Sequence, residues 1–582
     1  MGNVPSVAPY GTWKSPISAA LAVQRTVLFQ QPDVCNGDIY WIEERAAENG
    51  RSVIMHETAD GAVKELPAPW SARSTLYGRG GGAFAVHDAT LFFVEETDQR
   101  VYRLDPGCDP VPLTRSDARF GGLTVDPSRP RLLAIRESGV PPERALVALD
   151  FNARDSLGTP LLETPQFLSA PSMSPDGQKV AWTSWPKDGH PDRGAALYYA
   201  DLHDETPLRP TLVVDYAEKA IAQPLWSPDG HLFFLSDQSG WWNLYEWDFE
   251  AIRPVTSLHA DFGEFSFRVG LHHFGFLDRN RLIASYWIHG QAFLVSIDRS
   301  TREMTHLPCP YTQISSLWVH DGQVLAITAS DRLPDTVTRL NVDLKRHRTV
   351  RRAPVLPLEE EALSIGEPLT FPLDNGELGY AFYYPAKSPD YIAPEGEYPP
   401  LILRRHSDKV GRATARFSPE VHYWTTRGFS VVDLNFGGSC GYGRAYRTMP
   451  IDPVHEIDAL IRFLSRHQKA DADRVILHDE GPTPEFLGNP RNLRAATVRL
   501  FGPLPVTSQL AIPTLAVQGL RIHFMGPHRH SDWPTVLDLS SAHELLQVQL
   551  RCYAAILGIR LPYQTTPHGQ EGIPTMFPEY RD

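Results

Sequence analysis

Residues 174–185 read SPDGQKVAWTSW, which is a polar turn followed directly by a short run of mainly apolar residues. Residues 227–237 read SPDGHLFFLSD and repeat the same arrangement. Pro and Gly in a short polar cluster mark a turn, and a β-branched and aromatic run after such a turn is typical of a strand. The two stretches therefore predict two copies of one β unit.

Five further segments of the same kind occur in the first 350 residues, so the unit recurs seven times. Each unit continues through a polar turn into a second strand that ends near an aspartate. A β unit repeated every 40 to 50 residues or so is the signature of a β-propeller, with one unit per blade. Seven starts predict seven blades, and unrelated hairpins in a sandwich are the weaker alternative. The starts are Asp38, Thr90, Arg131, Lys179, His231, Arg281 and Gln323.

The pattern changes after about residue 350. Continuous apolar runs at residues 400–403, 429–434, 474–477 and 511–517 alternate with stretches that favour helices, at residues 419–427, 455–467 and 540–558. Strands that are apolar throughout, separated by helices, are typical of a parallel sheet covered on both faces. The sequence therefore predicts a β-propeller followed by an α/β domain.

The composition excludes several classes of protein. The chain has 582 residues and a formal charge of −14, from 55 Lys and Arg against 69 Asp and Glu. An acidic chain lacks the basic surface that nucleic acid requires, and no window of 18 apolar residues predicts a membrane span. The N-terminus shows no secretory signal, and the five cysteines are isolated. We therefore expect a cytoplasmic protein with no cofactor, no metal, and no nucleic-acid or membrane partner.

Three longer motifs carry a resemblance. They are YGTWKSPI at residues 10–17, SGWWNLY at residues 239–245 and NFGGSCGYGR at residues 435–444. They are similar to the prolyl oligopeptidase family, most closely to its bacterial acylaminoacyl-peptidase and dipeptidyl-aminopeptidase branch. The resemblance implies an N-terminal segment, residues 1–30, that packs on the C-terminal domain. It also implies a seven-bladed propeller over residues 31–355 and a shortened α/β-hydrolase-like domain over residues 356–582, with the active site between them.

The resemblance fails at the nucleophile. Family members carry a Ser in a GxSxG elbow after a strand that reads DRVIL here, at residues 473–477. The matching position is Gly481, which has no side chain. The next residue, Pro482, lacks the backbone N–H that would stabilise the oxyanion. The sequence thus predicts that the nucleophile and one oxyanion donor are both missing.

The other members of the family's triad also find no match. The catalytic Asp of the family lies two residues after a Gln-Gly-Leu motif, and that position is Ile522 here. The stretch before the last helix, DWPTV at residues 532–536, has no Gly-His-Gly-like turn for the catalytic His. Residues 437–441, GGSCG, match GxSxG as a string, but we expect a loop rather than a helix after them. We therefore do not predict Ser439 as a nucleophile.

Polar residues at the former elbow are the remaining candidates for catalysis. His478, Asp479 and Glu480 follow a predicted parallel strand, and His406 and Asp408 follow another strand that ends at the same edge. Ligands bind at such strand ends in open α/β sheets, and one of two neighbouring carboxylates can have a raised pKa. We predict these five residues as acid–base candidates, with a solvated acidic loop as the alternative.

Histidines also gather near the C-terminus. His523, His528 and His530 form the densest imidazole cluster, followed by Asp532. Their spacing matches no zinc signature, and a metal site would need three or four converging ligands. We predict an exposed loop here rather than a metal site.

These observations leave the function open between three hypotheses. The favoured one is a peptidase-family homologue without serine-peptidase chemistry, repurposed for proton transfer, cyclisation or isomerisation on a peptide-like or natural-product substrate. The first alternative is a pseudoenzyme that binds a peptide or a partner protein. The second alternative is a hydrolase with an unrecognised nucleophile. Whether the chain is an enzyme thus stays open. In each case we expect the ligand between the propeller and the α/β domain, and relatives of this type often form homo-oligomers.

Overall fold

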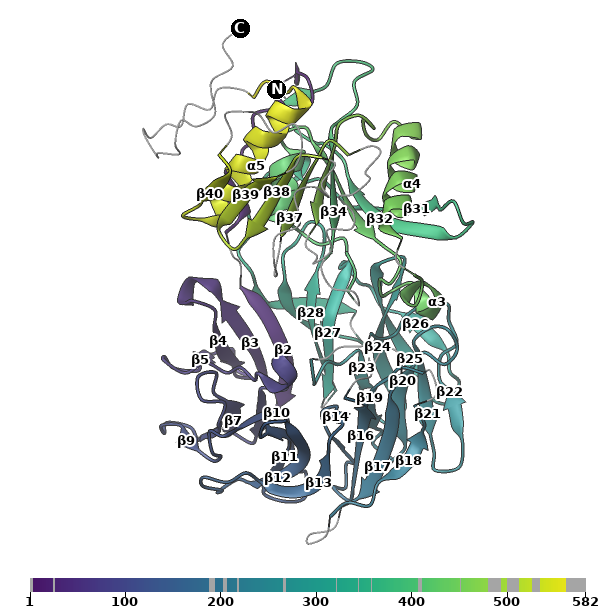
Figure 1. The fold of residues 1–582 in the computed structure, drawn as a ribbon. Helices are drawn as coiled ribbons and strands as arrows, with labels where there is room; N and C mark the ends of the chain where they lie inside the picture. The colour runs from purple at the N-terminus through teal and green to yellow at the C-terminus, as the bar shows by residue number, and fades with distance from the viewer. Residues whose placement is uncertain are drawn as a thin grey trace.

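The computed structural model describes residues 4–24, 27–187, 194–202, 207–216, 219–264, 268–320, 322–343, 345–356, 358–406, 411–450, 452–479, 493–499, 512–525 and 534–561. Within these ranges the chain forms a seven-bladed propeller and an α/β domain stacked on one end of it (Figure 1). The predicted fold class is therefore confirmed.

The first three blades are four-stranded antiparallel sheets. Blade one contains β2 (Leu28–Cys35), β3 (Asp38–Arg45), β4 (Arg51–Glu57) and β5 (Val63–Glu65). Blade two contains β6 (Phe84–His87), β7 (Thr90–Val94), β8 (Val101–Leu104) and β9 (Val111–Pro112). Blade three contains β10 (Ala118–Val125), β11 (Arg131–Ser138), β12 (Glu143–Asp150) and β13 (Thr159–Thr164).

The remaining four blades follow the same plan. Blade four contains β14 (Phe167–Leu168), β15 (Ser172–Met173), β16 (Lys179–Trp185), β17 (Ala196–Asp201) and β18 (Thr211–Val214). Blade five contains β19 (Ile221–Trp226), β20 (Leu232–Ser236), β21 (Asn243–Trp247) and β22 (Ile252–Pro254). Blade six contains β23 (Phe274–Phe276), β24 (Arg281–Ile288), β25 (Gln291–Asp298) and β26 (Met304–His306). Blade seven contains β27 (Gln313–His320), β28 (Gln323–Ala329), β29 (Thr336–Asn341) and β30 (Arg346–Arg352), and it contacts blade one to close the ring.

In six blades the predicted start marks the second strand. In blade four it marks β16, which follows two short strands, β14 and β15, that both pair with it. We refer to these seven strands as second strands. Six of these strands begin at the predicted residue, and β20 begins one residue later, at Leu232. Second strands are buried almost throughout, whereas the last strands β5 and β22 are exposed along their whole length. The repeat is therefore clearest in the strand whose neighbours on both sides demand apolar residues. In the SPDG turns, Gly177 and Gly230 adopt positive φ values of 67° and 87°, which a side chain disfavours.

The α/β domain is built on one nine-stranded sheet in the order β31-β32-β35-β34-β36-β37-β38-β39-β40. Its centre is parallel, from β35 through β38, and both edges are antiparallel. The strands are β31 (Glu367–Pro372), β32 (Leu378–Tyr384), β34 (Leu401–Arg405), β35 (Ser430–Asn435), β36 (Val475–Asp479), β37 (Ala495–Arg499), β38 (Thr514–Gln518), β39 (Arg521–Met525) and β40 (Val536–Asp538).

Helices cover both faces of this sheet. On one face α2 (Pro419–Thr425) and α5 (Ala542–Leu557) share an apolar core with the N-terminal α1 (Ala19–Ala22). On the other face α4 (Pro453–Arg466) packs on a second core. A short helix, α3 (Gly443–Arg447), lies toward the propeller (Figure 1). Single 3₁₀ turns occur at η1 (Ala46–Glu48), η2 (Leu76–Gly78) and η3 (Glu360–Ala362).

The N-terminal segment packs on the α/β domain before the chain enters the propeller. Its strand β1 (Ser6–Val7) pairs in parallel with β33 (Tyr391–Ile392). Gly11 lies against Ile559, so closely that a Cβ there would be 2.7 Å from Ile559 Cδ1. The propeller is therefore tethered to the α/β domain by the chain at both ends.

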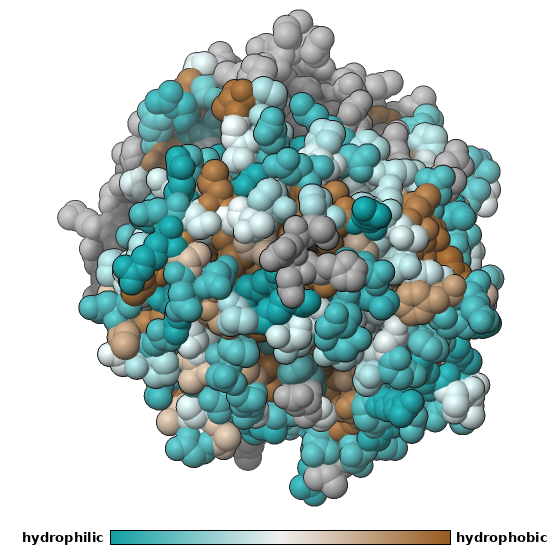
Figure 2. All heavy atoms as spheres, turned by 90° about the horizontal axis from the view of Figure 1, so that it is seen from below, coloured by the Kyte–Doolittle hydropathy of each residue, from teal (hydrophilic) through white to brown (hydrophobic). Residues whose placement is uncertain are grey.

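The propeller face turned away from the α/β domain is mainly hydrophilic, with scattered hydrophobic residues (Figure 2). No helix within the described part of the chain is long and apolar enough to cross a membrane.

Candidate functional site

The C-terminal ends of β34, β35 and β36 form the edge of the sheet at which the candidate residues lie. The loop after β35 leads into α3, where the backbone N–H of Gly443 donates to Asp261 Oδ2 of the propeller at 3.0 Å. This edge therefore faces the propeller. In open α/β sheets, ligands bind at the carboxyl ends of the strands, which is the edge described here.

Asp479 is the last residue of β36, and it is held by an arginine on the neighbouring strand. Arg405 lies opposite Asp479 in the parallel register, and it donates from Nε to Oδ1 at 3.1 Å and from Nη2 to Oδ2 at 3.4 Å. Both side chains are buried. The Arg405 guanidinium also lies 4.7 Å from the centre of the Phe436 ring. A carboxylate held this way supports the sheet edge and is poorly placed to exchange protons with a ligand.

His478 points to the opposite face of the sheet. Successive residues of a strand alternate between faces, and His478 reaches α5, where its Nε2 lies 2.5 Å from Tyr553 Oη. The same hydroxyl lies 2.5 Å from Thr497 Oγ1 of β37. The ring also packs edge-on against Trp424 of α2. His478 is thus part of a buried polar chain within the domain core.

The structure therefore does not bring His478 and Asp479 together, although they are adjacent in sequence. Glu480 and Asp408, which complete the five predicted candidates, lie outside the described residues, as does Gly481 at the position of the family's nucleophile. Sequence reasoning missed Arg405, although an arginine ending a buried strand is a signal that a buried acid lies nearby.

His406 is placed at the edge itself, immediately after β34. Its Nε2 lies 2.8 Å from Ser439 Oγ, and its ring stacks on Phe436 with centroids 4.4 Å apart. The loop expected after Gly441 is one reason not to predict Ser439 as a nucleophile. In the structure the short helix α3 begins at Gly443. A serine hydroxyl bonded to a histidine is the arrangement that activates a nucleophile, so this pair needs testing against its surroundings.

Those surroundings are unfavourable for acyl transfer. Ser439 has no solvent exposure, so a substrate carbonyl does not reach its hydroxyl in this conformation. An oxyanion hole needs free N–H donors, and the loop's backbone N–H groups are already bonded. Gly437 N donates to Glu456 Oε2, Gly438 N to the Tyr446 carbonyl, Ser439 N to the Phe436 carbonyl and Cys440 N to the Gly411 carbonyl. The pair therefore has the geometry of a loop-stabilising contact.

Ile522, at the position of the family's catalytic Asp, is a core residue. It lies in β39, pairs with Val517 of β38 and is fully buried in the apolar core beneath α2 and α5. Gln518 and Arg521 pair across the tight turn of this hairpin, so β39 folds straight back along β38. A carboxylate at this position would have no polar environment to support it.

Glu456 is a buried acid that the sequence analysis did not identify. It lies in the first turn of α4, and burial raises the pKa of its carboxyl to about 7. Its Oε2 accepts the Gly437 N–H at 2.9 Å, while its Oε1 is buried without a hydrogen-bond partner. The sequence signal was weak, because a glutamate in the first turn of a helix is ordinarily a surface residue that favours the helix dipole.

The predicted histidine cluster is described only in part. His523 lies in β39 and pairs with Ala516, and its Nε2 is buried without a hydrogen-bond partner. His528 and His530 lie outside the described residues. Among the described residues no group of His, Cys, Asp and Glu has the arrangement of a metal site.

The contact between the two domains is built from propeller acids and α/β-domain arginines. Arg444 donates from Nη2 to Asp237 Oδ1 at 2.7 Å, and Arg447 donates to the same carboxylate. Arg412 donates from Nη1 to Glu264 Oε2 at 2.5 Å. Burial by itself would raise the pKa of Glu264, but the Arg412 charge outweighs it and holds this pKa below its usual range. We call these five residues the interdomain ion-pair group.

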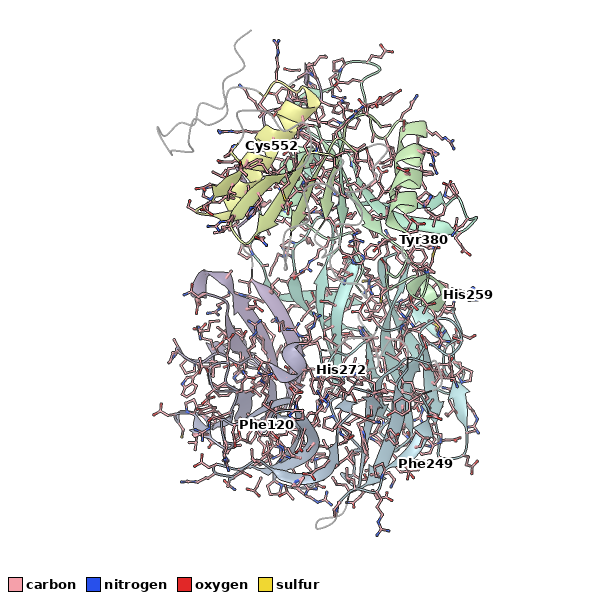
Figure 3. The ribbon with its side chains drawn as sticks, in the orientation of Figure 1. Phe120, Phe249, His259, His272, Tyr380 and Cys552 are labelled. Atoms are coloured by element: carbon pink, nitrogen blue, oxygen red, sulfur yellow. The ribbon has the colours of Figure 1, made fainter. Side chains whose placement is uncertain are left out.

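Further contacts extend the junction along blades five to seven. Thr312 Oγ1 donates to the Ala415 carbonyl at 2.5 Å, and Phe417 N donates to the Ser330 carbonyl at 2.6 Å. The side chain of Tyr380, at the α/β side of the junction, is labelled in Figure 3. It stacks on Tyr442 with ring centroids 4.2 Å apart. A surface pocket of about 260 Å³ opens on blade six, where Phe293 and Tyr311 line it, and it contains none of the candidate residues.

Comparisons with known proteins agree with this architecture. No protein-family model matches the chain. A puromycin-hydrolysing peptidase of Mycobacterium tuberculosis has a TM-score of 0.85 and 25% identity, over 96% of this chain and 98% of that one. The acylaminoacyl peptidase of Pyrococcus horikoshii has a TM-score of 0.62 at 12% identity, over 83% and 78%, which shows the fold alone.

One curated relative is similar to this chain over a short segment. Dipeptidyl-peptidase 5 of Porphyromonas gingivalis is 34% identical over 103 residues, which cover 17% of this chain and only 14% of that relative. Such a match does not carry over the activity of the whole enzyme. Taken with the full-length structural matches, it agrees with the resemblance of the three sequence motifs. The structural neighbours of this chain are peptidases of the prolyl oligopeptidase family, and the chain has their fold.

Proposed function

We propose that this chain binds a peptide-like ligand between the propeller and the α/β domain and does not hydrolyse it by the family's serine mechanism. The observation that carries the proposal is the Arg405–Asp479 ion pair. It occupies the end of β36, the strand that leads to the family's nucleophile position, with two buried charges that satisfy each other.

The other described candidates support the same conclusion. His478 is bonded into the core through Tyr553, and Ile522 fills apolar space at the position of the family's acid. General acid–base catalysis needs a group within reach of the substrate that gains and loses a proton near the working pH. Side chains already held inside the domain are poorly suited to that task. This supports binding over the repurposed catalysis that the sequence analysis favoured.

The junction between the domains supports binding in a positive sense. Ligand sites of enzymes and binding proteins occur preferentially where domains meet. The edge carrying His406 is only partly buried and faces the propeller. The peptidases with this fold include one named for the hydrolysis of puromycin, an aminoacyl nucleoside whose amide bond resembles a peptide. Puromycin and short peptides are therefore the first probes to use.

A second candidate function is favoured by one contact. The 2.8 Å distance between His406 Nε2 and Ser439 Oγ would suit a hydrolase with Ser439 as nucleophile and His406 as its base. Such a hydrolase would need a movement that exposes Ser439 and frees an N–H of its loop. The repurposed catalyst of the sequence analysis stays a hypothesis as well, with His406 as its half-buried acid or base.

The test combines a binding measurement with an activity measurement on the full chain. Puromycin and the peptide Z-Gly-Gly-Phe are titrated by isothermal calorimetry, and the solution is then analysed by mass spectrometry. We expect saturable binding of at least one probe and its recovery intact. Cleavage of the bound probe, or the failure of both probes to bind, would contradict the proposal.

A fluorophosphonate probe separates the two candidate functions. Under the binding proposal it labels no serine of the native chain. Labelling that disappears in Ser439→Ala and persists in Ser300→Ala would instead establish Ser439 as a nucleophile. Ser300 is a suitable control because its hydroxyl is exposed on the propeller and bonds to Asp298.

A further inference from the structure

Two connections between blades are much longer than the others, residues 66–83 between β5 and β6 and residues 255–273 between β22 and β23. Blade five ends with β22 at Pro254, and blade six begins with β23 at Phe274. The residues between them are described at 255–264 and 268–273. We call the described residues, 255–264 and 268–273, the axial strap, because they leave the rim of the propeller and approach its centre.

One part of the axial strap holds the α/β domain. Asp261 accepts the Trp242 N–H within blade five and the Gly443 N–H of α3, both at 3.0 Å. Glu264 accepts from Arg412, whose guanidinium also lies 4.4 Å from the centre of the Trp287 ring. Arg412 in turn packs against Gly441, where a Cβ would be 3.1 Å from its Cδ. The strap is thus bonded directly to Gly443 and reaches Gly441 through Arg412, and both glycines follow Ser439 and Cys440 in the loop.

The next part of the strap is clasped by a run of glycines in the connection between blades one and two. Val269 forms a parallel bridge with Gly81, and its N–H donates to the Gly80 carbonyl at 3.1 Å. A Cβ on Gly81, whose φ is +108°, would lie 2.1 Å from the Val269 carbonyl oxygen. A Cβ on Gly82 would lie 2.5 Å from Gly122 of blade three. The sequence GRGGG at residues 78–82 therefore permits backbone-to-backbone contact that side chains would prevent.

These contacts place the strap across the propeller axis. In a closed ring of seven blades, the gap between blades five and six lies opposite blade two. Arg268 donates from Nη2 to Gln30 Oε1 of blade one at 2.5 Å, and the His272 carbonyl accepts the Leu317 N–H of blade seven at 2.9 Å. Figure 3 shows His272 in the middle of the propeller, between the blades on either side. The strap therefore bonds to blades one and seven, and to the glycine run between blades one and two, from its origin between blades five and six.

We propose that the axial strap closes the central channel of the propeller beneath the junction and fixes the α/β loop at residues 437–443 against it. Ligands then reach the junction from the side, between the domains, and the glycine clasp at Gly80–Gly82 controls how firmly that loop is held. The closed channel and the fixed loop do not depend on whether the bound ligand is cleaved.

The test disrupts the glycine clasp by substitution and measures the effect on the loop at residues 437–443. Gly81→Ala places a Cβ against Val269 and must displace the strap. Amide exchange of the peptide covering residues 268–274 reports the clasp, and alkylation of buried Cys440 by iodoacetamide, mapped by mass spectrometry, reports the loop. We expect both rates to rise by about tenfold or more, since both report opening of the same strap.

Gly78→Ala is the matched control. Gly78 also has a positive φ, +72°, but nothing lies within 4 Å of its Cβ position. Both rates should stay within about twofold of the native chain, since this alanine strains the backbone without moving the strap. Faster exchange of the strap in Gly81→Ala with unchanged alkylation of Cys440 would overturn the link between clasp and loop. Unchanged exchange in a folded Gly81→Ala chain would overturn the clasp itself.

Glu264→Gln tests the contact between the strap and the α/β domain directly. This variant is also the test to use if Gly81→Ala does not fold. It weakens the contact to Arg412 and leaves the Gly80–Val269 hydrogen bond in place. We expect faster alkylation of Cys440 with native exchange at residues 268–274. Native alkylation of Cys440 in this variant would overturn the proposal.

Discussion

Two charged regions of the α/β domain, at neighbouring places on the same sheet edge, are built in opposite ways. At the end of β36, Arg405 and Asp479 pair within the domain, and both are buried. After β35, Arg444 and Arg447 reach out of the domain to Asp237 of the propeller. The first region resembles the interior of a stable domain, and the second resembles an interface.

The two regions differ in how a movement of the domains would affect their ion pairs. Charges that satisfy each other inside one domain do not change when the domains move. Charges that pair across a junction are broken by the same movement that would admit a ligand, and relative motion is the default for domains joined by a polar interface. We therefore expect substitutions at the end of β36 to affect stability and substitutions at the junction to affect the coupling of the two domains.

Asp237→Ala should have the largest effect. Asp237 is fully buried and accepts from two arginines, and Arg447 is itself buried, so the variant leaves an uncompensated charge. We expect a loss near the upper end of about 3–5 kcal/mol and unfolding in two separate transitions by scanning calorimetry. Arg253→Ala, which removes the exposed partner of an ion pair with Asp248 on the same blade, should unfold like the native chain. A single native-like transition in Asp237→Ala would show that the charges at the junction do not couple the two domains.

Asp479→Asn should destabilise the α/β domain by about 3 kcal/mol, since Arg405 keeps a weaker acceptor but loses its counter-charge. Urea unfolding followed by tryptophan fluorescence measures this loss. The double variant Arg405→Met, Asp479→Leu should recover most of the stability, because apolar residues often replace a buried pair at little cost. If Asp479→Asn instead uncoupled the domains without loss of stability, the two regions would not differ as we describe.

The buried carboxyl of Glu456 predicts a pH effect. Its pKa is about 7 in the folded chain against an ordinary value of 4.5, so the folded state holds the proton more tightly than the unfolded state. The stability that this proton contributes is complete below about pH 4.5 and is lost as the pH rises to about 7, by up to about 3 kcal/mol. Glu456→Gln should flatten this part of the profile of unfolding free energy against pH.

The exposed Glu359→Gln is the control for this measurement and should leave the profile as it is. A native slope between pH 5 and 7 in Glu456→Gln would mean that another group carries the effect.

Asp538→Asn should have the smallest effect. Its carboxylate pairs with Arg521 on the exposed hairpin of β39 and β40, and both side chains are in solvent. Exposed pairs of this kind contribute little and are screened by salt. We expect no measurable change in the urea midpoint, and a clear change would show that this edge of the sheet is more tightly packed than its exposure suggests.

Most of the fold could be predicted from the sequence. The propeller follows from the second strands of the blades, whose residues must be apolar because each is sandwiched between two others. The α/β domain follows from apolar runs that the structure places within a few residues of the predicted positions. The first strands of the blades were not predicted for two reasons. The strands β14 and β23 are only two or three residues long. The longer strands β2, β10 and β27 each carry a register shift, which interrupts the alternation of apolar and polar residues.

The candidate site could be predicted only as a location. The sequence identified the end of β36 and the end of β34 as one edge, and the structure places Asp479 and His406 at the ends of these strands. It grouped His478 with Asp479, whereas strand alternation sends them to opposite faces. Arg405, Tyr553 and Glu264 were missed because each meets its partner through a contact across 74 or more positions in the chain.

The repeat of the blades, the change to an α/β domain and the family resemblance could all be recognised in the sequence. Each rests on residues that are close together in the chain, where turn chemistry and periodicity act directly. The partners of the charged groups, the burial of Ile522 and the contact of Gly80–Gly82 with the axial strap became visible only in the folded chain. These depend on burial and on the meeting of distant segments, and the energy of a charge or a glycine is set by its surroundings rather than by its neighbours in sequence.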